Sequence, residues 1–426
     1  MIRIVKAADR RVVEFNKRPA FPVEAEEAAR EVLAEIRRDG DKAVCKYVAK
    51  FDGFKATRPA ELRLDVAKIT AKGIDKRILK AVKTAHDRVY AFSEASLRKP
   101  WKMRTPKGGS AGEFFSPMER VGVYIPGGTA PLASTSIMTV TLAKAAGVKE
   151  IVACTPAGRD GKVNPVLLYA LKMAGATEIY RVGGIQAIGM MAFGTKHCKK
   201  VQKIAGPGNA FVTAAKRQVF GYVAIDQVAG PSEIAVLTDG SVDAKWVAAD
   251  LLSQAEHGSG WEKSLCVCTS KEQAKTILDE VMRQTEMLSR KEFVKKVIDR
   301  DGILIVIAKD VDEGLGVVNR FAPEHFEIMT KDASRVMRGV TSAGAVFVGA
   351  WTPESAGDFV AGPSHVLPTG GAANMFSGLT PDDFRRRHSF VAFTREDLEA
   401  TRDSIAAFAE VEGLDGHGRA ATIRFE

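Results

Sequence analysis

The hydrophobic and polar positions of this chain predict helices and strands over most of its length. Apolar residues recur every three or four positions over 23–39, which predicts an amphipathic helix that stops at Gly40. A second, longer helical pattern covers 74–97. The basic, glycine-containing stretch 98–112 that follows is expected to be a loop.

From Val121 onward, short apolar runs alternate with helical patterns. Helices are expected at 134–146, 165–174, 243–256 and 271–288. Strands are expected at 121–125, 150–154, 178–182, 233–239, 264–270, 302–308, 324–330 and 343–350. This alternation predicts an α/β fold with two doubly wound, Rossmann-like domains and mainly parallel sheets.

The pattern also suggests how the domains divide the chain. We expect an N-terminal segment at 1–21, a first, discontinuous α/β domain at 22–122 and 231–379, and a second α/β domain at 123–230. The remaining 380–426 is expected to be a helical tail with a short strand at 421–426. Because a helix and a strand that follow a finished domain often dock on a partner chain, the tail is a predicted dimerisation segment.

Composition narrows the class of protein. The 426 residues are 46% hydrophobic and 27% charged, with a net charge of +10 and five cysteines in no metal-finger spacing. The longest basic run is 385–387, too short for a dedicated nucleic-acid patch. The N-terminus has no apolar signal core, and no apolar run reaches membrane-spanning length. We therefore expect a cytoplasmic protein that binds neither membrane nor nucleic acid.

Glycine turns at strand ends are candidates for binding an anion. They occur at 124–128, 182–186 and 206–209 and carry Tyr124, Gln186 and Asn209. Glycines allow backbone N–H groups to approach a ligand, and the following helix N-terminus favours negative charge. Ordinary strand-to-helix turns are the alternative reading. A match to G-x-G-x-x-A at 416–421 is rejected because no strand precedes it.

The richest stretch in acid and imidazole side chains is 322–371. It holds Glu324, His325, Asp358 and His365 among glycines and prolines. Histidine moves protons near neutral pH, and an adjacent glutamate can position it or activate water. A salt-bridged strand edge and a turn aspartate are the structural alternatives.

Two further segments could complete that stretch. Gln254 and His257 are three residues apart at the end of a predicted helix, so they share a face and could bind a metal through oxygen and nitrogen. Polar residues are also common at helix ends for structural reasons alone. His417, between two glycines of the tail, would by itself be assigned to the solvent-exposed surface.

Taken together, these motifs resemble the histidinol dehydrogenase family. The resemblance runs in order from about Glu24 to Ile423, and its most specific segments are GPGNAFVTAAKRQV and DLLSQAEHG. The family consists of homodimeric enzymes, swapped through their C-terminal segments, that use zinc and NAD. They oxidise a primary alcohol to a carboxylate in two hydride-transfer steps through a bound aldehyde.

The resemblance implies roles for individual residues. Glu324 and His325 would be the catalytic pair, with His325 as general base and Glu324 as water activator. The zinc ligands would be Gln254, His257, Asp358 and, from the other subunit, His417. Contacts with NAD would come from Tyr124, Gln186 and Asn209. The substrate site would include the catalytic pair and the zinc ligands, together with Ser134, Ser232, His365 and Glu412.

The departures from the family pattern concern substrate recognition. Ser364 stands where the family usually has Asn, and the loop at 110–121 lacks a common Gln. The resemblance favours oxidation of L-histidinol to L-histidine, a step of histidine biosynthesis. Some relatives oxidise sulfopropanediol (2,3-dihydroxypropane-1-sulfonate) to sulfolactate instead. A zinc hydrolase that uses His325 and Glu324 is a more remote alternative.

Overall fold

The computed structural model describes residues 2–18, 21–127 and 132–426, and the chain forms two compact units. The first unit comprises Met1–Ser96 and Glu119–Phe384, and the second comprises Leu97–Met118 and Arg385–Glu426. Within the described ranges, no helix combines the length and the apolar content needed to cross a membrane.

The first unit contains two six-stranded sheets, of which sheet A is entirely parallel. Its strands are almost completely buried, as expected for a parallel sheet covered on both faces. In spatial order they are β1 (Arg3–Lys6), β12 (Ile303–Ile307), β11 (Lys263–Cys268), β10 (Glu233–Thr238), β13 (His325–Met329) and β14 (Ala345–Val348).

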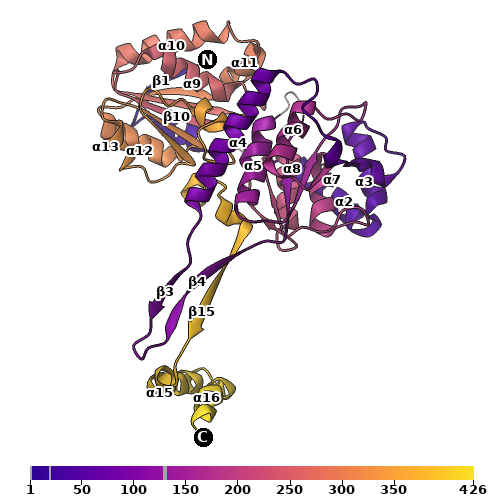
Figure 1. Ribbon diagram of the computed structural model, residues 1–426. Coiled ribbons are helices and arrows are strands. Elements are labelled where there is room, and N and C mark those ends of the chain that lie inside the picture. Colours follow the sequence, from indigo (N-terminus) through magenta and orange to yellow (C-terminus); the bar gives the residue numbers. More distant parts are fainter. Residues whose placement is uncertain (1, 19–20, 128–131) are drawn as a thin grey trace. The chain divides into compact units, whose positions relative to one another are not determined.

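Two groups of helices cover sheet A (Figure 1). One face packs against α9 (Ala244–Ala255), α10 (Lys271–Thr285) and α11 (Lys291–Asp299). The other face packs against α1 (Arg10–Asn16), α12 (Val311–Phe321) and α13 (Ala333–Met337). The short helix α14 (Glu354–Phe359) follows β14 and contacts α9.

Sheet B is parallel except for its first strand, β2, which runs antiparallel to β7. In spatial order it contains β2 (Arg63–Leu64), β7 (Glu178–Arg181), β6 (Glu150–Thr155), β5 (Arg120–Tyr124), β8 (Lys203–Ala205) and β9 (Ala224–Ile225). One face packs against α2 (Val23–Asp39), α3 (Asp41–Tyr47), α7 (Gly184–Phe193) and α8 (Ala210–Val219). Near the other face lie α5 (Ala133–Ala145), α6 (Pro165–Ala174) and α4 (Lys76–Ser96), with α4 packed on α5.

The expected fold class is confirmed, since both large sheets are mainly parallel and enclosed by helices. The expected domain boundaries differ from the sheets. Residues 3–6 add the edge strand β1 to sheet A instead of forming a separate segment. Residues 23–64 belong with sheet B, because the apolar stripe of α2 packs on α7 and α8 and β2 pairs with β7. Apolar periodicity predicts that α2 is buried, but it does not name the sheet that buries it.

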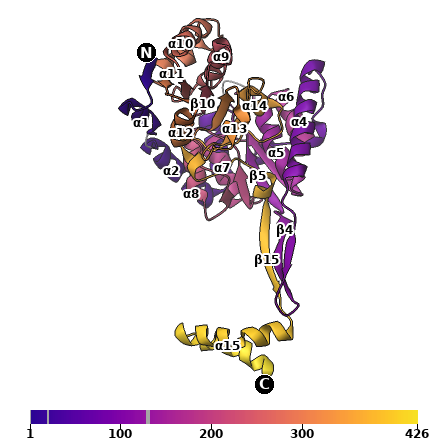
Figure 2. The ribbon, with the colours of Figure 1, turned by 90° about the vertical axis from the view of Figure 1, so that its left-hand side faces the viewer.

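The second unit contains a three-stranded antiparallel sheet and two helices. Its strands are β3 (Trp101–Arg104), β4 (Ser110–Pro117) and β15 (Arg385–Ala392), and β4 and β15 pair along their full length (Figure 2). The helices are α15 (Arg395–Val411) and α16 (Asp415–Thr422), which pack on each other.

Two local predictions in this unit were wrong. The stretch 98–112 is not a loop, because it contains β3 and the start of β4. The tail does not end in a strand, because 421–426 continues α16 and closes in a 3₁₀ turn at Ile423–Phe425. Every residue of β3 is exposed, so the strand lacks the alternation of apolar and polar positions that marks a half-buried strand.

Candidate active site

The acid and imidazole side chains gather at the amino-terminal edge of sheet A. His325 is the first residue of β13, and it lies opposite Ile234 of the parallel strand β10. Glu324 therefore lies beside the start of β10, where its Oε2 accepts a hydrogen bond from the backbone N–H of Glu233 at 3.0 Å. Ser232, which is half-buried, immediately precedes this strand.

The hydrogen bonds of His325 leave one ring nitrogen available. Its Nδ1 lies 3.0 Å from the backbone carbonyl of Glu233, and because a carbonyl can only accept, Nδ1 carries the proton. Its Nε2 has no hydrogen-bond partner within the part of the chain that the structure describes. That atom lies 3.6 Å from Oδ1 of Asp358 and 3.9 Å from Oε1 of Glu354.

Burial and mutual charge set the protonation of this group. Burial lowers the pKa of His325, but the carboxylates of Glu324, Asp358 and Glu354 outweigh it and raise the pKa to about 10. Burial raises the pKa of Glu324 to about 8 and, with the charge of Asp358, that of Glu354 to about 7. Although burial opposes it, the imidazoles of His325 and His365 hold the pKa of Asp358 well below its usual range. The cluster thus brings three carboxyls and two imidazoles together in a buried space, and a bound cation would lower the pKa of each of them.

The carboxyl end of α9 contributes Gln254 and His257. The Gln254 side chain is fully buried, and neither Oε1 nor Nε2 has a hydrogen-bond partner among the described residues. An unpaired buried polar group costs about 1–3 kcal/mol, so this amide is poised for a ligand. The Nδ1 of His257 lies 3.2 Å from the carbonyl oxygen of Gln254, which leaves its Nε2 free to bind a metal.

Two overlapping sets of residues could hold a metal ion. One atom each from His325, Glu354 and Asp358 lies within 4.8 Å of the others. The alternative set is Gln254, His257 and Asp358, with His325 left as a base. The unpartnered amide of Gln254 favours the second set, because a metal would satisfy its buried oxygen. Oxygen and imidazole ligands without a thiolate suit Zn²⁺.

His365 connects this group to α5. Its Nδ1 lies 3.0 Å from the carbonyl oxygen of Asp358, and its Nε2 lies 3.2 Å from Oγ1 of Thr135. The preceding Ser364 donates from Oγ to the carbonyl oxygen of Met138 at 2.8 Å. Ser364 therefore anchors the loop to α5 through a backbone contact. A cavity of about 440 Å³ is lined by His325, Asp358 and His365 together with apolar residues such as Phe92, Phe347 and Leu367.

The second candidate region lies at the carboxyl-terminal edge of sheet B. Tyr124, Gln186 and Asn209, predicted from three separate glycine turns, line one cavity of about 690 Å³. The amino ends of α7 and α8 border this cavity, which also contains Lys162. Gly128, part of the first turn, lies outside the described residues.

Hydrogen bonds fix the shape of the sheet B cavity. The hydroxyl of Tyr124 accepts from the backbone N–H of Gly184 at 3.1 Å. Asp52 accepts from the N–H of Gly183 at 2.9 Å and from the amide of Gln186 at 3.3 Å. Asn209 caps α8 by accepting from the N–H groups of Phe211 and Val212. The turns are thus held with their helix N-termini facing a ligand-sized space.

Three further predicted residues belong to α5 of the first unit and to the second unit. Ser134 is half-buried near the start of α5, next to Thr135. Glu412 and His417 belong to the second unit, and both are exposed. Their roles at the site of a second copy of the chain stay predictions.

Sequence reasoning missed three polar residues of these regions: Glu354, Thr135 and Asp52. Glu354 and Asp358 are four residues apart, which would have suggested one face of a short helix behind Pro353. Thr135 lies between two serines at the start of α5, where hydroxyl side chains are common, and gave no signal. Asp52 ends a π-helical turn, Val48–Asp52, before Gly53, a feature that side-chain pattern does not reveal.

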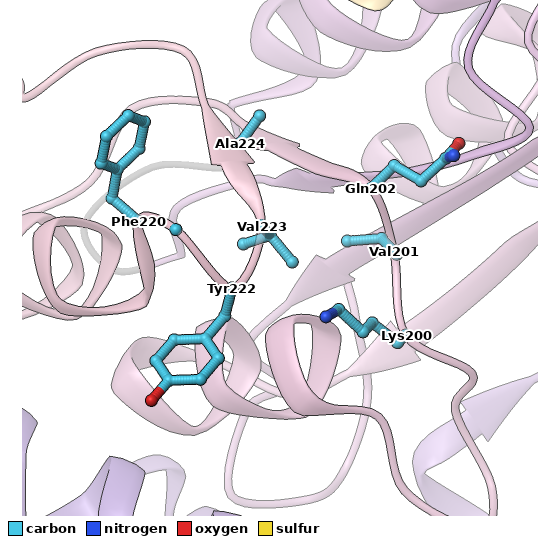
Figure 3. Close-up of a pocket in the computed structure, with 8 residues that line it drawn as sticks. Lys200, Val201, Gln202, Phe220, Tyr222, Val223 and Ala224 are labelled. Atoms are coloured by element: carbon cyan, nitrogen blue, oxygen red, sulfur yellow. The ribbon is translucent and has the colours of Figure 1, made fainter. Parts of the chain in front are cut away.

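Another hollow, at the β9 edge of sheet B, lacks the side chains that acid–base or metal chemistry would need. It measures about 580 Å³ and is lined by 200–202 and 220–224. Its Phe220 and Tyr222 side chains project in different directions (Figure 3). The hydroxyl of Tyr222 already accepts a hydrogen bond from Arg37 at 2.8 Å. No acid or imidazole lines this hollow in the part of the chain that the structure describes.

Comparison with known proteins gives a consistent result. The sequence model of the family described as histidinol dehydrogenase matches residues 16–425. The histidinol dehydrogenase of Heliobacterium mobile is 42% identical over 398 residues, which cover 93% of this chain and 92% of that protein. The enzyme of Bacillus cereus (strain ATCC 10987) is 42% identical over 396 residues, covering 93% and 91%.

Comparison with solved structures indicates the same family. The crystal structure of histidinol dehydrogenase from Elizabethkingia anophelis matches with a TM-score of 0.94 and 34% identity, covering 100% of this chain and 98% of that one. An acetylating aldehyde dehydrogenase from Geobacillus thermoglucosidasius matches with a TM-score of 0.50 and 15% identity, covering 88% and 98%. The second likeness extends to the fold alone.

Proposed function

The chain belongs to the histidinol dehydrogenase family, and we propose that it oxidises L-histidinol to L-histidine with zinc and NAD. The observation that carries this proposal is the buried His325, whose Nε2 has no hydrogen-bond partner among the described residues and lies 3.6 Å from Oδ1 of Asp358. A histidine base next to side chains that can hold a metal ion is an arrangement suited to alcohol oxidation.

His325 would act as the general base. Its Nδ1–H donates to the carbonyl of Glu233, so Nε2 is the atom that would take the hydroxyl proton of the alcohol. The positive charge of a nearby zinc would lower the pKa of the imidazole and so free Nε2 for this role. The hydride leaves the carbon that bears this hydroxyl, which yields the aldehyde. The hydrogen bond to the backbone fixes both the tautomer and the direction of the ring.

Glu324 would serve the second oxidation. Water must add to the aldehyde before a second hydride can leave, and Glu324 would take a proton from that water. Its carboxylate is buried and held by the N–H of Glu233, next to the base. The net reaction consumes one alcohol, one water and two NAD, and gives a carboxylate, two NADH and three protons.

Gln254, His257 and Asp358 would hold the zinc, with His417 of a second copy as a further ligand. A bound zinc would polarise the alcohol and aldehyde oxygens. The orphaned amide of Gln254 and the free Nε2 of His257 support this set.

The sheet B cavity would bind NAD through Tyr124, Gln186 and Asn209, which already line one space. The helix N-termini there would face the pyrophosphate. Bound NAD would accept each hydride. Asp52 would keep Gln186 and the turn at Gly183 in place.

The charge around the sheet A cavity supports L-histidinol as the substrate. None of the residues that the structure describes as lining it is Lys or Arg, whereas Asp358 is at its wall and Glu354 is adjacent. A sulfonate would have no cationic side chain to pair with there, whereas the protonated amine of histidinol would be attracted by the carboxylates. Ser134, Ser232, His365 and, from a second copy, Glu412 would complete the substrate site.

A homodimer is part of the proposal. The second unit exposes Phe408 at 70%, Val411 at 87% and Val391 at 66%, a large apolar surface for so small a unit. A second copy would cover these residues, and its active site would include Glu412 and His417 of the first copy.

The free cysteines suit the cytoplasmic location that we expect.

Reaction stoichiometry tests the function. Purified protein with zinc, NAD and L-histidinol should produce two NADH per L-histidine formed. One NADH per substrate, with free aldehyde accumulating, would contradict the two-step scheme. Sulfopropanediol, assayed in parallel, should give no NADH.

Complementation tests the shared site. His325→Ala and His417→Ala chains should each be inactive as homodimers. Mixed after unfolding and refolding together, they should regain activity, because one of the two sites then has both native histidines. Absence of recovery would count against a site shared between two copies.

A further inference from the structure

A buried ion pair lies beside the glycine turn that opens α8, at the carboxyl-terminal edge of sheet B. Nζ of Lys216 contacts Oδ1 of Asp226, and the two side chains are only 2% and 3% exposed. The proposed mechanism uses neither residue. Taking both charges out of water is costly, and apolar side chains of similar volume often stabilise a fold as well. Stability alone therefore gives no reason for charges at this position.

Both side chains bind the backbone of one residue, Gly206. Nζ of Lys216 donates to the carbonyl oxygen of Gly206 at 2.8 Å. Oδ2 of Asp226 accepts from the backbone N–H of Gly206 at 2.7 Å. Gly206 is buried and lies one residue beyond Ala205, the last residue of β8. The ion pair thus supplies a donor and an acceptor to a buried residue where the chain leaves the sheet.

Three elements meet at this residue. Lys216 follows Asn209 by two turns of α8, so both lie on one face of the helix. Helix side chains tilt toward the amino end, which is how Lys216 reaches back to the turn. Asp226 directly follows β9, which pairs in parallel with β8. The ion pair is neutral as a unit, so its effect on the neighbouring cavity is one of geometry.

The position of Gly206 sets the distance between two walls of the sheet B cavity. Its φ of +120° favours glycine, and a Cβ there would clash with the backbone carbonyl of Tyr124 in β5. Three residues later, Asn209 caps α8. Tyr124 and Asn209 both line the cavity. A shift of Gly206 would therefore move the amino end of α8 relative to Tyr124.

We propose that Lys216 and Asp226 form a clamp on Gly206 that holds the amino end of α8 where it can bind the pyrophosphate of NAD. Both are positioning residues that act through the backbone of the turn, and neither is among the described residues that line the cavity. Binding groups have to stay within about 0.5 Å of their productive positions, so a small shift of the turn matters. This inference rests on the proposed NAD site.

The test measures the affinity of the full-length protein, supplied with zinc, for NADH by fluorescence titration without substrate. Lys216→Met takes the donor from the Gly206 carbonyl and the counter-charge from Asp226. The Kd for NADH should rise by about tenfold or more, the value of one hydrogen bond to a charged group. In turnover, the KM for NAD should rise in the same way. A partly folded variant would lower kcat alone, because KM does not depend on the amount of active enzyme.

A double variant separates affinity from stability. Lys216→Met/Asp226→Leu leaves no unpaired charge, so its midpoint of urea unfolding should lie above that of Lys216→Met. Gly206 has then lost both side-chain partners, so the Kd for NADH should stay at least as high as in Lys216→Met. If Lys216→Met does not fold, the double variant carries the test.

Arg120 provides a matched control at the opposite edge of the same sheet. It is 6% exposed and pairs with Glu178 at 2.7 Å. It begins β5, the strand that ends at Tyr124. Arg120→Met should lose stability as Lys216→Met does, because each change takes the nearest cation from a largely buried carboxylate. Its Kd for NADH should equal that of the wild type.

The outcomes separate the clamp from the cofactor site. Wild-type affinity for NADH in Lys216→Met and in the double variant would overturn the clamp. So would a double variant whose affinity recovers together with its stability, or an Arg120→Met variant that binds NADH as weakly as Lys216→Met. If the wild type binds no NADH, or if Asn209→Asp binds it as tightly as the wild type, the proposed cofactor site itself is wrong.

Discussion

Sheets A and B are built from the same strand-and-helix unit, yet they place their functional side chains at opposite edges. In sheet A the site lies at the amino ends of β10 and β13, where α9 presents its carboxyl end. In sheet B the cavity lies at the carboxyl ends of β5, β6 and β7, where α7 and α8 present their amino ends.

The two edges differ in electrostatic sign. A helix carboxyl end carries partial negative charge and unpaired carbonyls, which favour a cation. A helix amino end carries partial positive charge and free N–H groups, which favour an anion. The edge of sheet A adds buried carboxylates and imidazoles, whereas the edge of sheet B adds glycine turns and neutral amides. One architecture thereby offers one edge suited to a cation and another suited to an anion.

The largest effect should come from the base on the sheet A side. His325→Ala removes the proton acceptor and should lower kcat by about 10²–10⁴-fold, because general-base catalysis contributes about that much. Zinc content, measured by atomic absorption, should stay near the wild-type value. His86→Ala, on α4, is the matched control and should retain full activity. Residual turnover above a tenth of the wild type would remove His325 from its assigned role.

The next effect should separate metal binding from folding. Gln254→Leu removes a proposed zinc ligand, so zinc affinity and activity should both collapse. The same change also removes a buried amide without a partner, so the metal-free protein should gain about 1–3 kcal/mol. Urea unfolding in the presence of a chelator measures this gain. Gln273→Leu, which breaks a hydrogen bond to Thr238, should lose stability and keep its zinc. A metal-free Gln254→Leu protein less stable than wild type would show that the amide is satisfied in another way.

A smaller effect should appear on the sheet B side. Asn209→Asp keeps the cap of α8, since both residues cap well, but places a negative charge where the pyrophosphate would lie. We expect the KM for NAD to rise by about tenfold or more, because one charge-assisted contact is worth about 1.5–3 kcal/mol. Asn209→Ala should instead cost about 1 kcal/mol of stability with a smaller change in KM. Identical KM values for the two variants would contradict the anion site.

The smallest effect should come from Lys162, the exposed lysine at the wall of the same cavity. If backbone N–H groups hold the anion, Lys162→Gln should change the KM for NAD by less than about threefold, in keeping with exposed ion pairs worth about 0–1 kcal/mol. The remaining effect should vanish in high salt. A loss larger than that of Asn209→Asp would assign the anion to side-chain charge instead.

The sequence predicted elements well where one face of the element is buried. The expected helices at 23–39 and 165–174 match α2 and α6, because α2 has an apolar stripe and α6 has an Asn164 cap, Pro165 and Gly175. The strands of both parallel sheets were found because they are continuous apolar runs. By contrast, β3 and β15 are largely exposed, and the basic run 385–387 belongs to a strand whose partner, β4, is far away in sequence.

Prediction of the candidate site was limited in the same way, to features that lie within one segment of the sequence. Glu324, His325 and Asp358 stand out by residue type and spacing, and Gln254 by its helix end. The hydrogen bond from the backbone N–H of Glu354 to Glu327 does not, because the two residues are 27 apart in sequence and only the fold brings α14 beside β13. Chemistry that depends on one segment is visible in sequence, whereas chemistry that depends on two segments must await the fold.

The hydrogen bonds of Ser364 and His365 to α5 have a consequence for the rate of turnover. Helix α5 packs with sheet B, whereas the loop of Ser364 and His365 follows the last strand of sheet A. Swinging one sheet away from the other would break both bonds, at a cost of about 0.5–1.5 kcal/mol each. These bonds thus favour one arrangement of the two sheets, which would keep the proposed NAD cavity and the proposed base at a fixed separation. A catalyst with such a fixed separation should turn over at a rate that is indifferent to solvent viscosity, because no large closing motion has to precede each hydride transfer.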